Sequence, residues 1–386
     1  MVLLATPLIL IIGDVNECAA SDFDVICIVD GAKAYKDEAM SEPVAELAYW
    51  TVVSWVDWRE YGYQSVRLAD GSIVFSDSQN FGRALTTYVD ALNVRSQPNL
   101  SGGVTARIER DEEFAEAPTG WEFADGYGWL KVKLPDGSEG WAASIYLIPR
   151  SYYRELEKAE ALAKSGDTDA LIKELESLTG IVEGFPDEKG TVGVSPDGKY
   201  VVFSMVGGIL VVFEQGAGIT AYHDIFLAAS AVKWSQNSRY YAFDEGSWIL
   251  RGLHVFDTED GKTALDAGVL QDNYYFIGED LFVWVEYDQL SSETKFENPD
   301  AEGIFEDENK YLEVPSVRVL DLRTGETITV LEPNPNTLRK DGYPIMINLA
   351  PTDELEGNAD RLKPITDLDL FKEYAEKPQI CIESQA

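Results

Sequence analysis

The sequence predicts a mainly β protein that contains two small barrels, a short helical hairpin and a propeller-like antiparallel β domain. Two internal repeats support this prediction. The phrases YGYQSVRLADGS (61–72) and YGWLKVKLPDGS (127–138) share seven of twelve residues at an offset of 66. A different phrase recurs about every 40 residues from Val194 onward. Repeats of these periods indicate tandem modules, in which each repeat folds as one supersecondary unit.

The chain of 386 residues is longer than a single hydrophobic core usually supports, so several domains are expected. Changes in composition and in hydrophobic period divide it into six segments. We expect a signal or anchor segment at 1–20, barrels at 25–80 and 88–149, a helical hairpin at 150–180, the propeller-like domain at 181–350 and a C-terminal extension at 351–386.

The protein is strongly acidic, with 68 Asp and Glu against 31 Lys and Arg and a formal net charge of −37. Such a surface repels nucleic acid and anionic lipid, because Lys and Arg must neutralise phosphates for either to bind. It is compatible with cationic partners, with a salty environment, or with a solvated acidic surface that has no specific cationic partner. We therefore expect no nucleic-acid partner.

The N-terminus carries an apolar run, Val2–Ile12, that is shorter than the roughly 20 residues a membrane-spanning helix needs. Its length matches the core of a signal peptide, and Cys18 to Ala20 provide small residues for cleavage. No Lys or Arg precedes the run, so a mis-assigned start, a buried first strand or a lipid anchor on Cys18 are alternatives. We expect an exported protein without a membrane-spanning segment beyond such a signal or anchor.

Three cysteines occur in the chain, and two of them lie in apolar, strand-like contexts. These two, Cys27 and Cys381, could form one disulfide in an oxidising compartment. Two buried free thiols are the alternative. Because the sequence contains no CxxC pair, we expect no structural metal site.

The segment 88–149 alternates apolar and polar residues in short runs that are typical of β-strands. Turn sequences separate the runs. PDG at 135–137 is the clearest of them, and ADG at 69–71 takes the corresponding place in the first copy. Five short strands in about 60 residues would close into a small barrel, which removes exposed sheet edges.

Two stretches of the second copy, LNVRSQPN (92–99) and GWLKVKLPDGSEGWAASIYL (128–147), resemble a bacterial SH3 domain. The departures from the family pattern are small, with Gln97 in place of Gly and Ala142 in place of Val. The first copy keeps the DGS turn but has AYKDEA (34–39) where the second copy has NVRS. The resemblance implies two SH3-like barrels, of which the first has diverged.

The resemblance also implies modules that bind peptides, cell-wall peptide stems or partner proteins and that carry no catalysis of their own. Aromatic side chains bury large areas at low entropic cost, so the expected groove combines aromatic and polar contacts. Trp129 and Trp141 could instead fill the barrel core, and Arg95 could pair with a local carboxylate. The candidate ligand-binding residues are Asn93, Arg95, Tyr127, Trp129, Trp141 and Tyr146.

After Pro149 the hydrophobic period changes to that of a helix. Residues 151–164 predict one helix with Ser151 as its N-cap, and Gly166 follows its end. Asp167 is placed to cap a second helix. We expect this hairpin to act as a spacer or a docking element.

The propeller prediction rests on VSPDGKYVVF (194–203), WSQNSRYYAF (234–243) and IGEDLFVW (277–284), each a turn that enters an apolar strand. A period near 40 with four strands per unit is typical of propeller blades. The phrase SPDGKYVVF also resembles the repeats of WD-like, translocation-associated and prolyl-peptidase propellers. We expect three blades and a candidate fourth around 343–349. A small or open propeller, closure by dimerisation and a two-sheet sandwich are the alternatives.

The third repeat contains an acidic insertion between Asp288 and Glu313. Long loops on rigid blades often carry binding specificity, and a cationic ligand would fit this one. A mobile, solvated loop is the alternative. The candidate binding residues of the insertion are Glu297, Asp300, Glu302, Glu306, Asp307 and Glu308.

No catalytic motif is recognisable in the sequence. The chain has two histidines, and it lacks GxSxG, HExxH, a phosphate-binding glycine loop and GxGxxG after a strand. We therefore expect a protein that is not an enzyme and that uses no cofactor. A pair of carboxylates acting as a weak hydrolase is the remaining catalytic alternative.

Together these features predict a non-catalytic binding or scaffold protein of the bacterial envelope, in the periplasm or on the cell surface. Its expected ligands are cell-wall peptides or envelope proteins, bound through SH3-like grooves and a propeller face. The alternative is a structural surface protein that self-assembles into oligomers or filaments, and a homo-oligomer is compatible with either function.

Overall fold

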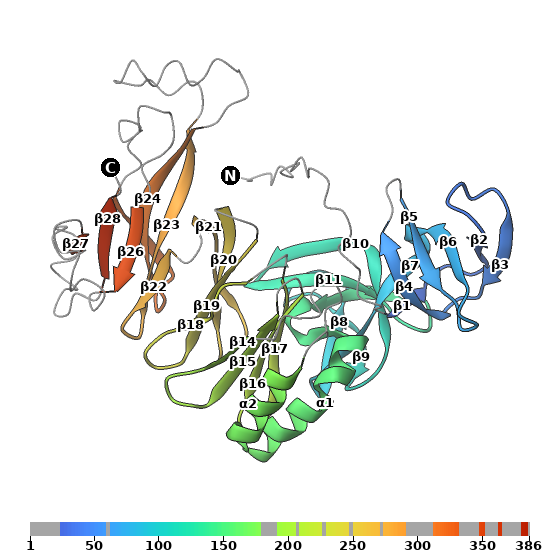
Figure 1. The fold of residues 1–386 in the computed structure, drawn as a ribbon, viewed down its shortest axis with the longest axis horizontal. Coiled ribbons are helices and arrows are strands. Elements are labelled where there is room, and N and C mark those ends of the chain that lie inside the picture. Colours follow the sequence, from blue (N-terminus) through green and yellow to red (C-terminus); the bar gives the residue numbers. More distant parts are fainter. Residues whose placement is uncertain are drawn as a thin grey trace.

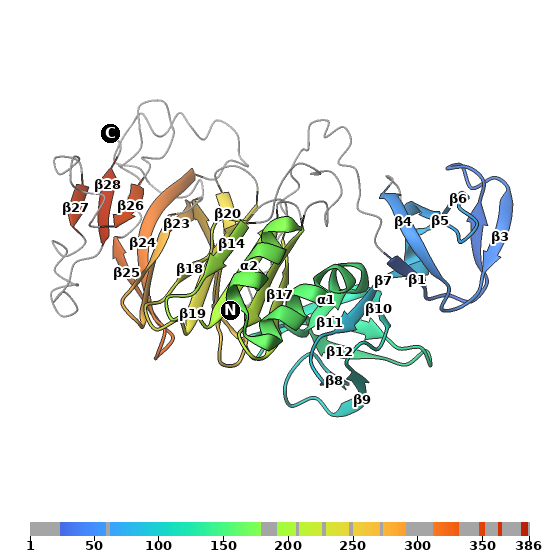
Figure 2. The ribbon, with the colours of Figure 1, turned by 60° about the horizontal axis from the view of Figure 1, so that its bottom comes forward.

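The structure is a computed structural model in which the N-terminal strands lie at one end of the molecule and the C-terminal sheet at the other (Figures 1 and 2). Two α-helices lie between these ends, and strands form most of the remaining regular structure that is described. The predicted mainly β fold class is confirmed. The structure describes residues 24–58, 62–178, 191–205, 208–225, 229–246, 250–270, 273–290, 312–331, 347–351, 362–364 and 380–384.

The N-terminal half forms one curled antiparallel sheet of 13 strands, ordered β3-β2-β6-β5-β4-β1-β7-β10-β11-β12-β8-β9 with β13 beside β7. The sheet folds into two barrel-like units, with one hydrophobic core around Val66 and another around Phe114. The strands are β1 (Asp24–Cys27), β2 (Ala32–Tyr35), β3 (Pro43–Leu47), β4 (Val52–Trp58), β5 (Tyr63–Arg67), β6 (Ile73–Asp77), β7 (Phe81–Thr87), β8 (Ala91–Arg95), β9 (Val104–Glu109), β10 (Phe114–Ala124), β11 (Tyr127–Lys133), β12 (Glu139–Ala143) and β13 (Leu147–Pro149).

The two units repeat one another in strand order as well as in sequence. In each, a hairpin is followed by a three-stranded meander whose last strand pairs back with the hairpin. The repeated DGS phrase makes the same turn twice: the Asp70 carboxylate accepts the N–H of Ser72, and the Asp136 carboxylate that of Ser138, both at 2.9 Å. Gly71 and Gly137, which stand between Asp and Ser in the two turns, have φ of +85° and +86°, a backbone conformation that favours glycine.

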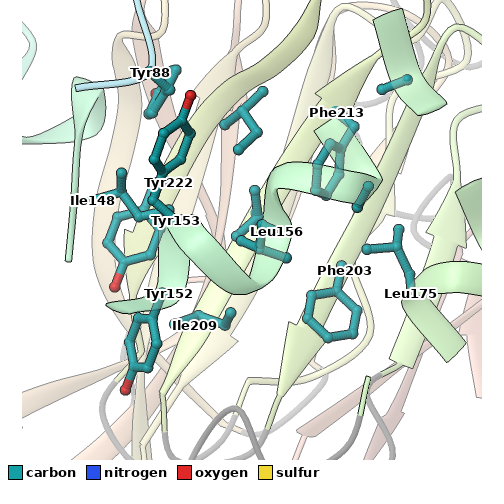
Figure 3. Packing of buried hydrophobic residues seen from close by; sticks show 14 of the residues in the cluster. Tyr88, Ile148, Tyr152, Tyr153, Leu156, Leu175, Phe203, Ile209, Phe213 and Tyr222 are labelled. Atoms are coloured by element: carbon teal, nitrogen blue, oxygen red, sulfur yellow. The ribbon is translucent and has the colours of Figure 1, made fainter. Parts of the chain in front are cut away.

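The predicted helical hairpin consists of α1 (Arg150–Ser165) and α2 (Thr168–Ser177). Its apolar face packs against both neighbours in a cluster that contains Tyr88 of the second barrel, Leu156 of α1 and Phe203 of the first blade (Figure 3). The hairpin is therefore a docking element that joins the barrel to the blade.

The caps of the two helices differ in how well they could be predicted. The Asp167 side chain accepts the N–H of Ala170 at 3.1 Å, which confirms it as the N-cap of α2. The prediction of Ser151 as the N-cap of α1 is wrong, because the helix already begins at Arg150. Pro149 precedes it, and the restricted φ of proline suits the entry to a helix.

The C-terminal half contains three four-stranded antiparallel sheets, each with its strands in sequential order. This arrangement is typical of propeller blades, and it confirms the predicted four strands per repeat. The strands of these blades are β14 (Thr191–Val194), β15 (Tyr200–Met205), β16 (Ile209–Glu214), β17 (Gly218–Asp224), β18 (Lys233–Trp234), β19 (Tyr240–Glu245), β20 (Leu250–Asp257), β21 (Thr263–Leu270), β22 (Tyr274–Ile277), β23 (Leu281–Leu290), β24 (Leu312–Asp321) and β25 (Glu326–Leu331).

A smaller sheet follows the third blade. Its strands are β26 (Ile347–Pro351), β27 (Leu362–Pro364) and β28 (Ile380–Ser384), in the order β26-β28-β27. The segment 351–386, predicted as a C-terminal extension, supplies two strands of this sheet. Strand β28 pairs with β26, and β26 includes the end of the stretch 343–349 that was the candidate fourth blade.

The Cys27 thiol is free and buried in the core of the first unit, where it donates to the Val29 carbonyl. The predicted disulfide with Cys381 is therefore not formed, and the free-thiol alternative describes Cys27. Burial raises the pKa of this thiol, which keeps it protonated and unreactive. The side chain of Cys381 lies outside the described residues.

Two further predictions fall on residues that the structure does not describe. One is the signal or anchor segment 1–20. The other is the acidic insertion between β23 and β24, with its candidate residues Glu297, Asp300, Glu302, Glu306, Asp307 and Glu308. Among the described residues, the helices are too short and too polar to cross a membrane.

Candidate binding site between barrel and blades

Trp129 is a buried residue of strand β11 in the second barrel. Its side chain is only 2% exposed, and its indole N–H donates to the Ala124 carbonyl at 3.0 Å. This burial corrects the prediction of Trp129 as a ligand contact. The indole alternates along β11 with Leu130 and Val132, which pack in the barrel core, and it meets the Tyr127 ring with centroids 6.3 Å apart.

Asn93, Arg95 and Trp141 lie on an outward face of the second barrel, on β8 and β12. Arg95 stands opposite Trp141 in the strand register, and its guanidinium donates to the Gly102 carbonyl at 2.9 Å. Arg95 thus holds the loop of the β8–β9 hairpin. A ligand-binding role for these three residues stays a prediction.

Tyr127 and Tyr146 lie where the second barrel meets the second blade. Both hydroxyls donate to the Asp260 carbonyl, at 2.8 and 3.2 Å. In the same turn, the Thr263 N–H donates to the Gly126 carbonyl at 2.8 Å. Burial raises the pKa of Tyr146 to about 12, so the hydroxyl stays protonated and can donate. These tyrosines dock the barrel on the blade.

A cavity of about 340 Å³ lies beside this junction. The volume falls at the lower end of the range of roughly 300–1,000 Å³ that is common for ligand sites. The second barrel supplies one wall from β7, β10 and β11, and the first two blades supply the other from β17, β19, β20 and β21. The cavity therefore exists only because the barrel and the blades are docked.

Two exposed aromatic side chains flank the cavity on the barrel side. Trp121 and Phe123 lie two residues apart on β10 and are 59% and 48% exposed. The indole of Trp121 lies beside Gly128 on the adjacent strand, where an added Cβ would be in ordinary contact with the indole nitrogen at 3.4 Å and would approach Ser144 Oγ to 2.8 Å. Aromatic groups in such a position anchor ligands well, because they bury large areas at low entropic cost.

The wall from the second blade combines carboxylates with aromatic rings. His254 lies between two carboxylates, with its Nε2 3.2 Å from Glu245 Oε1 and its Nδ1 3.5 Å from Asp266 Oδ1. Phe243 and Phe256 line the same wall, and their ring centroids are 5.9 Å apart. This wall therefore presents negative charge beside apolar rings.

Arg83 of β7 links the barrel to the first blade at the cavity. Its Nε lies 3.1 Å from Glu116 of β10, and its Nη2 lies 2.7 Å from Asp224 of β17. All three side chains are partly exposed, so each pair contributes little to stability. The pairs instead fix the relative position of the two cavity walls.

His223 also lines the cavity, and its Nε2 lies 2.8 Å from the Tyr241 hydroxyl. Burial, followed by the nearby charge of His254, lowers the pKa of His223 to about 3. The ring is therefore neutral at physiological pH. Both histidines of the chain thus line one cavity, which nothing in their sequence contexts indicated.

We expect His223 to make the protein less stable in acid. Its folded pKa of about 3 lies below the ordinary value for an unfolded chain, so protons bind preferentially to the unfolded state. The stabilisation is complete above pH about 6.5 and is lost as the pH falls toward 3. A single titrating group can change the free energy of unfolding by at most about 1.4 kcal/mol per pH unit. For His223 we expect a slope of about 1 kcal/mol per pH unit, because the ring keeps partial exposure.

Urea unfolding between pH 4 and 6.5 measures this effect. The variant His223→Gln keeps a side chain that can hydrogen-bond to Tyr241 but no longer titrates. Its stability should depend less steeply on pH than that of the wild type. Equal slopes for the two proteins would show that His223 does not cause the acid sensitivity.

Within the described residues, no group of three or more His, Cys, Asp or Glu side chains could hold a metal ion. The expected absence of catalysis and cofactors stays a prediction.

The strand arrangement defines the chain as a protein with SH3-like barrel topology joined to propeller-like blades. Residues 90–148 match the bacterial SH3 domain, which covers the second barrel. The match does not include the first unit. A search of curated proteins finds no significant match.

Solved structures of propellers are among those similar to this chain. The β-propeller domain of the trilobed protease from Pyrococcus furiosus is 12% identical, with 63% of this chain and 58% of that chain covered and a TM-score of 0.24. A β-propeller domain from Myceliophteria thermophila is 16% identical, with 42% and 45% covered and a TM-score of 0.26. This chain therefore covers less than two thirds of the length of each of these two structures.

Proposed function

We propose that this chain is an exported, non-catalytic binding protein of the bacterial envelope that recognises cell-wall peptides or envelope proteins. The bacterial SH3 domain at 90–148 supports a role of this class. The first unit, which repeats the strand order and the DGS turn of the second, is proposed to be a diverged domain of the same type.

The observation that carries the proposal is the exposed aromatic pair beside the cavity between barrel and blades. Trp121 and Phe123 present accessible rings next to a cavity of about 340 Å³. Such rings can bury an extended peptide at their surface, while the cavity receives one of its side chains. The proposed site thus uses one face of the barrel and one face of the propeller-like domain.

Binding of the full chain to isolated peptidoglycan sacculi tests the proposal. We expect salt-resistant binding, and Trp121→Ala should weaken it by about tenfold or more, as expected for loss of an aromatic anchor. Trp141→Ala is the matched control, because Trp141 is a half-buried tryptophan on the outward face of the same barrel.

The pattern of losses identifies the binding surface. Loss of binding in Trp141→Ala alone would move the site to the outward face with Asn93 and Arg95. Absence of wild-type binding would exclude the cell-wall ligand and leave envelope proteins as the proposed partners.

Self-assembly is the second candidate function, and the ends of the N-terminal sheet favour it. Strands β3 and β9 end the strand order, and each exposes a valine: Val44 is 50% exposed and Val104 is 54% exposed. Apolar edge strands can pair with a second copy. Light scattering over a range of protein concentrations tests this function, and a constant monomer mass would exclude it.

A further inference from the structure

We propose that a second cavity, at the junction of the two barrel units, binds a neutral peptide segment by accepting one of its carbonyl oxygens at the Gln64 side chain. This inference goes beyond the proposed function, because it adds a site between the first and second units. It is carried by a buried donor that has no partner and by the chemistry of the cavity around it.

The second cavity has a volume of about 250 Å³ and is lined by residues of β1, β4, β5, β7 and β10 and of the 3₁₀ turn Ser78–Asn80. Strand β7 joins the two units, since it pairs with β1 on one side and with β10 on the other. Its register with β10 runs to Ala84 and Ala115, and the cavity lies at the end of this pairing. The volume is below the roughly 300–1,000 Å³ common for whole small-molecule ligands, so it suits one residue of a peptide.

Gln64 of β5 is the polar residue that points to a ligand. It lines the cavity and is 4% exposed. Its side-chain amide nitrogen is buried and has no hydrogen-bond partner among the described residues. A buried donor without a partner costs free energy, which an acceptor would recover. Because Gln64 lines the cavity, a carbonyl oxygen bound there can supply this acceptor.

Apolar side chains line the cavity near this amide. Val25, Trp55 and Phe81 belong to the core of the first unit and are 3%, 9% and 5% exposed. Ala117 and Pro118 add apolar surface from β10. These residues favour an apolar side chain beside the carbonyl that Gln64 would bind, since its burial removes apolar surface from water.

The charges of the cavity lining cancel. Arg83 and Glu116 are the charged residues of the lining, and their side chains pair at 3.1 Å. Both also line the first cavity, and Arg83 has a further partner there in Asp224. A charged ligand would therefore lose its water without gaining an unengaged counter-charge. The net charge of −37 also opposes a carboxylate, so a neutral carbonyl is the acceptor that fits.

NMR spectra of the full chain, labelled with nitrogen-15, test the inference with blocked tripeptides as probes. The central residue is leucine, lysine or glutamate, and alanine flanks it. The variants Gln64→Met, Trp55→Phe and Trp121→Phe identify the side-chain signals of the three residues. We expect the leucine peptide to shift the Gln64 amide and Trp55 indole signals in a saturable way. The lysine and glutamate peptides should need about tenfold higher concentrations, because a charge must be desolvated.

Gln64→Met separates a donor that binds a ligand from one that holds the fold. Methionine keeps much of the volume but removes the amide. Without peptide, the variant should unfold at a higher urea concentration than the wild type, because the unpartnered donor is gone. Its affinity for the leucine peptide, measured at the Trp55 indole, should fall about fivefold, the factor for one neutral hydrogen bond. Gln97→Met is the matched control at an exposed position outside the cavity, and it should change neither quantity.

The outcomes separate this site from the proposed function. An unchanged Gln64 amide signal in a large excess of the leucine peptide would overturn the inference and leave an ordered water as the partner of the amide. A lower urea midpoint for Gln64→Met would also overturn it, because the amide would then stabilise the fold. Shifts at Trp121 without shifts at Trp55 would overturn the second site and support the first, and shifts at neither would count against both.

Discussion

Replacement of Trp129 by alanine is expected to destabilise the protein by about 3–5 kcal/mol, the range for removal of a large aromatic side chain from a core. The indole is 2% exposed and donates to the Ala124 carbonyl. The variant would leave a cavity and would lose the hydrogen bond to the partly buried Ala124 carbonyl. Urea unfolding followed by circular dichroism measures the change in the free energy of unfolding.

Trp121→Ala is the matched control, because it removes the same side chain from the same barrel. Trp121 is 59% exposed, so this change should cost less than about 1 kcal/mol. Equal costs for the two variants would contradict the assignment of Trp129 to the core and Trp121 to the surface. The same pair separates folding from binding, since only Trp121 is proposed to touch the ligand.

Arg251→Met is expected to cost about 3–5 kcal/mol, the range for breaking a buried ion pair by removal of one partner. Arg251 Nε donates to Asp244 Oδ1 at 2.8 Å, and the two side chains are 4% and 0% exposed. Another guanidinium nitrogen donates to the Gly246 carbonyl at 2.9 Å. Methionine would keep much of the volume but remove the ion pair that Arg251 makes with the buried carboxylate of Asp244.

An exposed ion pair provides the comparison for this variant. Lys33 pairs with Glu46 on the first unit, and the two side chains are 52% and 60% exposed. Lys33→Met should therefore change the free energy of unfolding far less than Arg251→Met does. A similar cost for Lys33→Met and Arg251→Met would argue that burial of the second pair does not determine its contribution.

The repeats of this fold were predictable because their signals are local. The DGS turns at Asp70 and Asp136 need an acceptor side chain and a glycine in fixed order, which the sequence displays directly. The same holds for the Asp167 cap and for the turn-and-strand phrases of the blades. Such features depend on neighbouring residues and not on the rest of the fold.

The roles of the individual tryptophans were not predictable. Trp121, Trp129 and Trp141 all lie on strands of one barrel, and the alternation of residues along these strands does not show which of them is buried. Strand β10 contains a register shift between Glu116 and Trp121, in a stretch where Pro118 and Gly120 interrupt the alternation of apolar and polar residues. This irregularity hides the strand in the sequence and with it the exposed aromatic pair.

The cavity itself depends on contacts between residues that are far apart in the chain. Its walls meet because Tyr127 and Tyr146 bind the turn at Asp260 and because Arg83 reaches Asp224. These contacts join the second barrel to two different blades. A reading of local patterns could predict the barrel and the blades, but not the site between them.

Hydrogen–deuterium exchange of the full chain, with and without soluble peptidoglycan fragments, tests the central claim most directly. The account predicts slower exchange in two separate stretches, 116–128 of the barrel and 243–266 of the second blade, because both line the cavity. Protection confined to 93–95 and 139–141, on the outward face of the barrel, would contradict the account and place the ligand in the groove first predicted from the sequence.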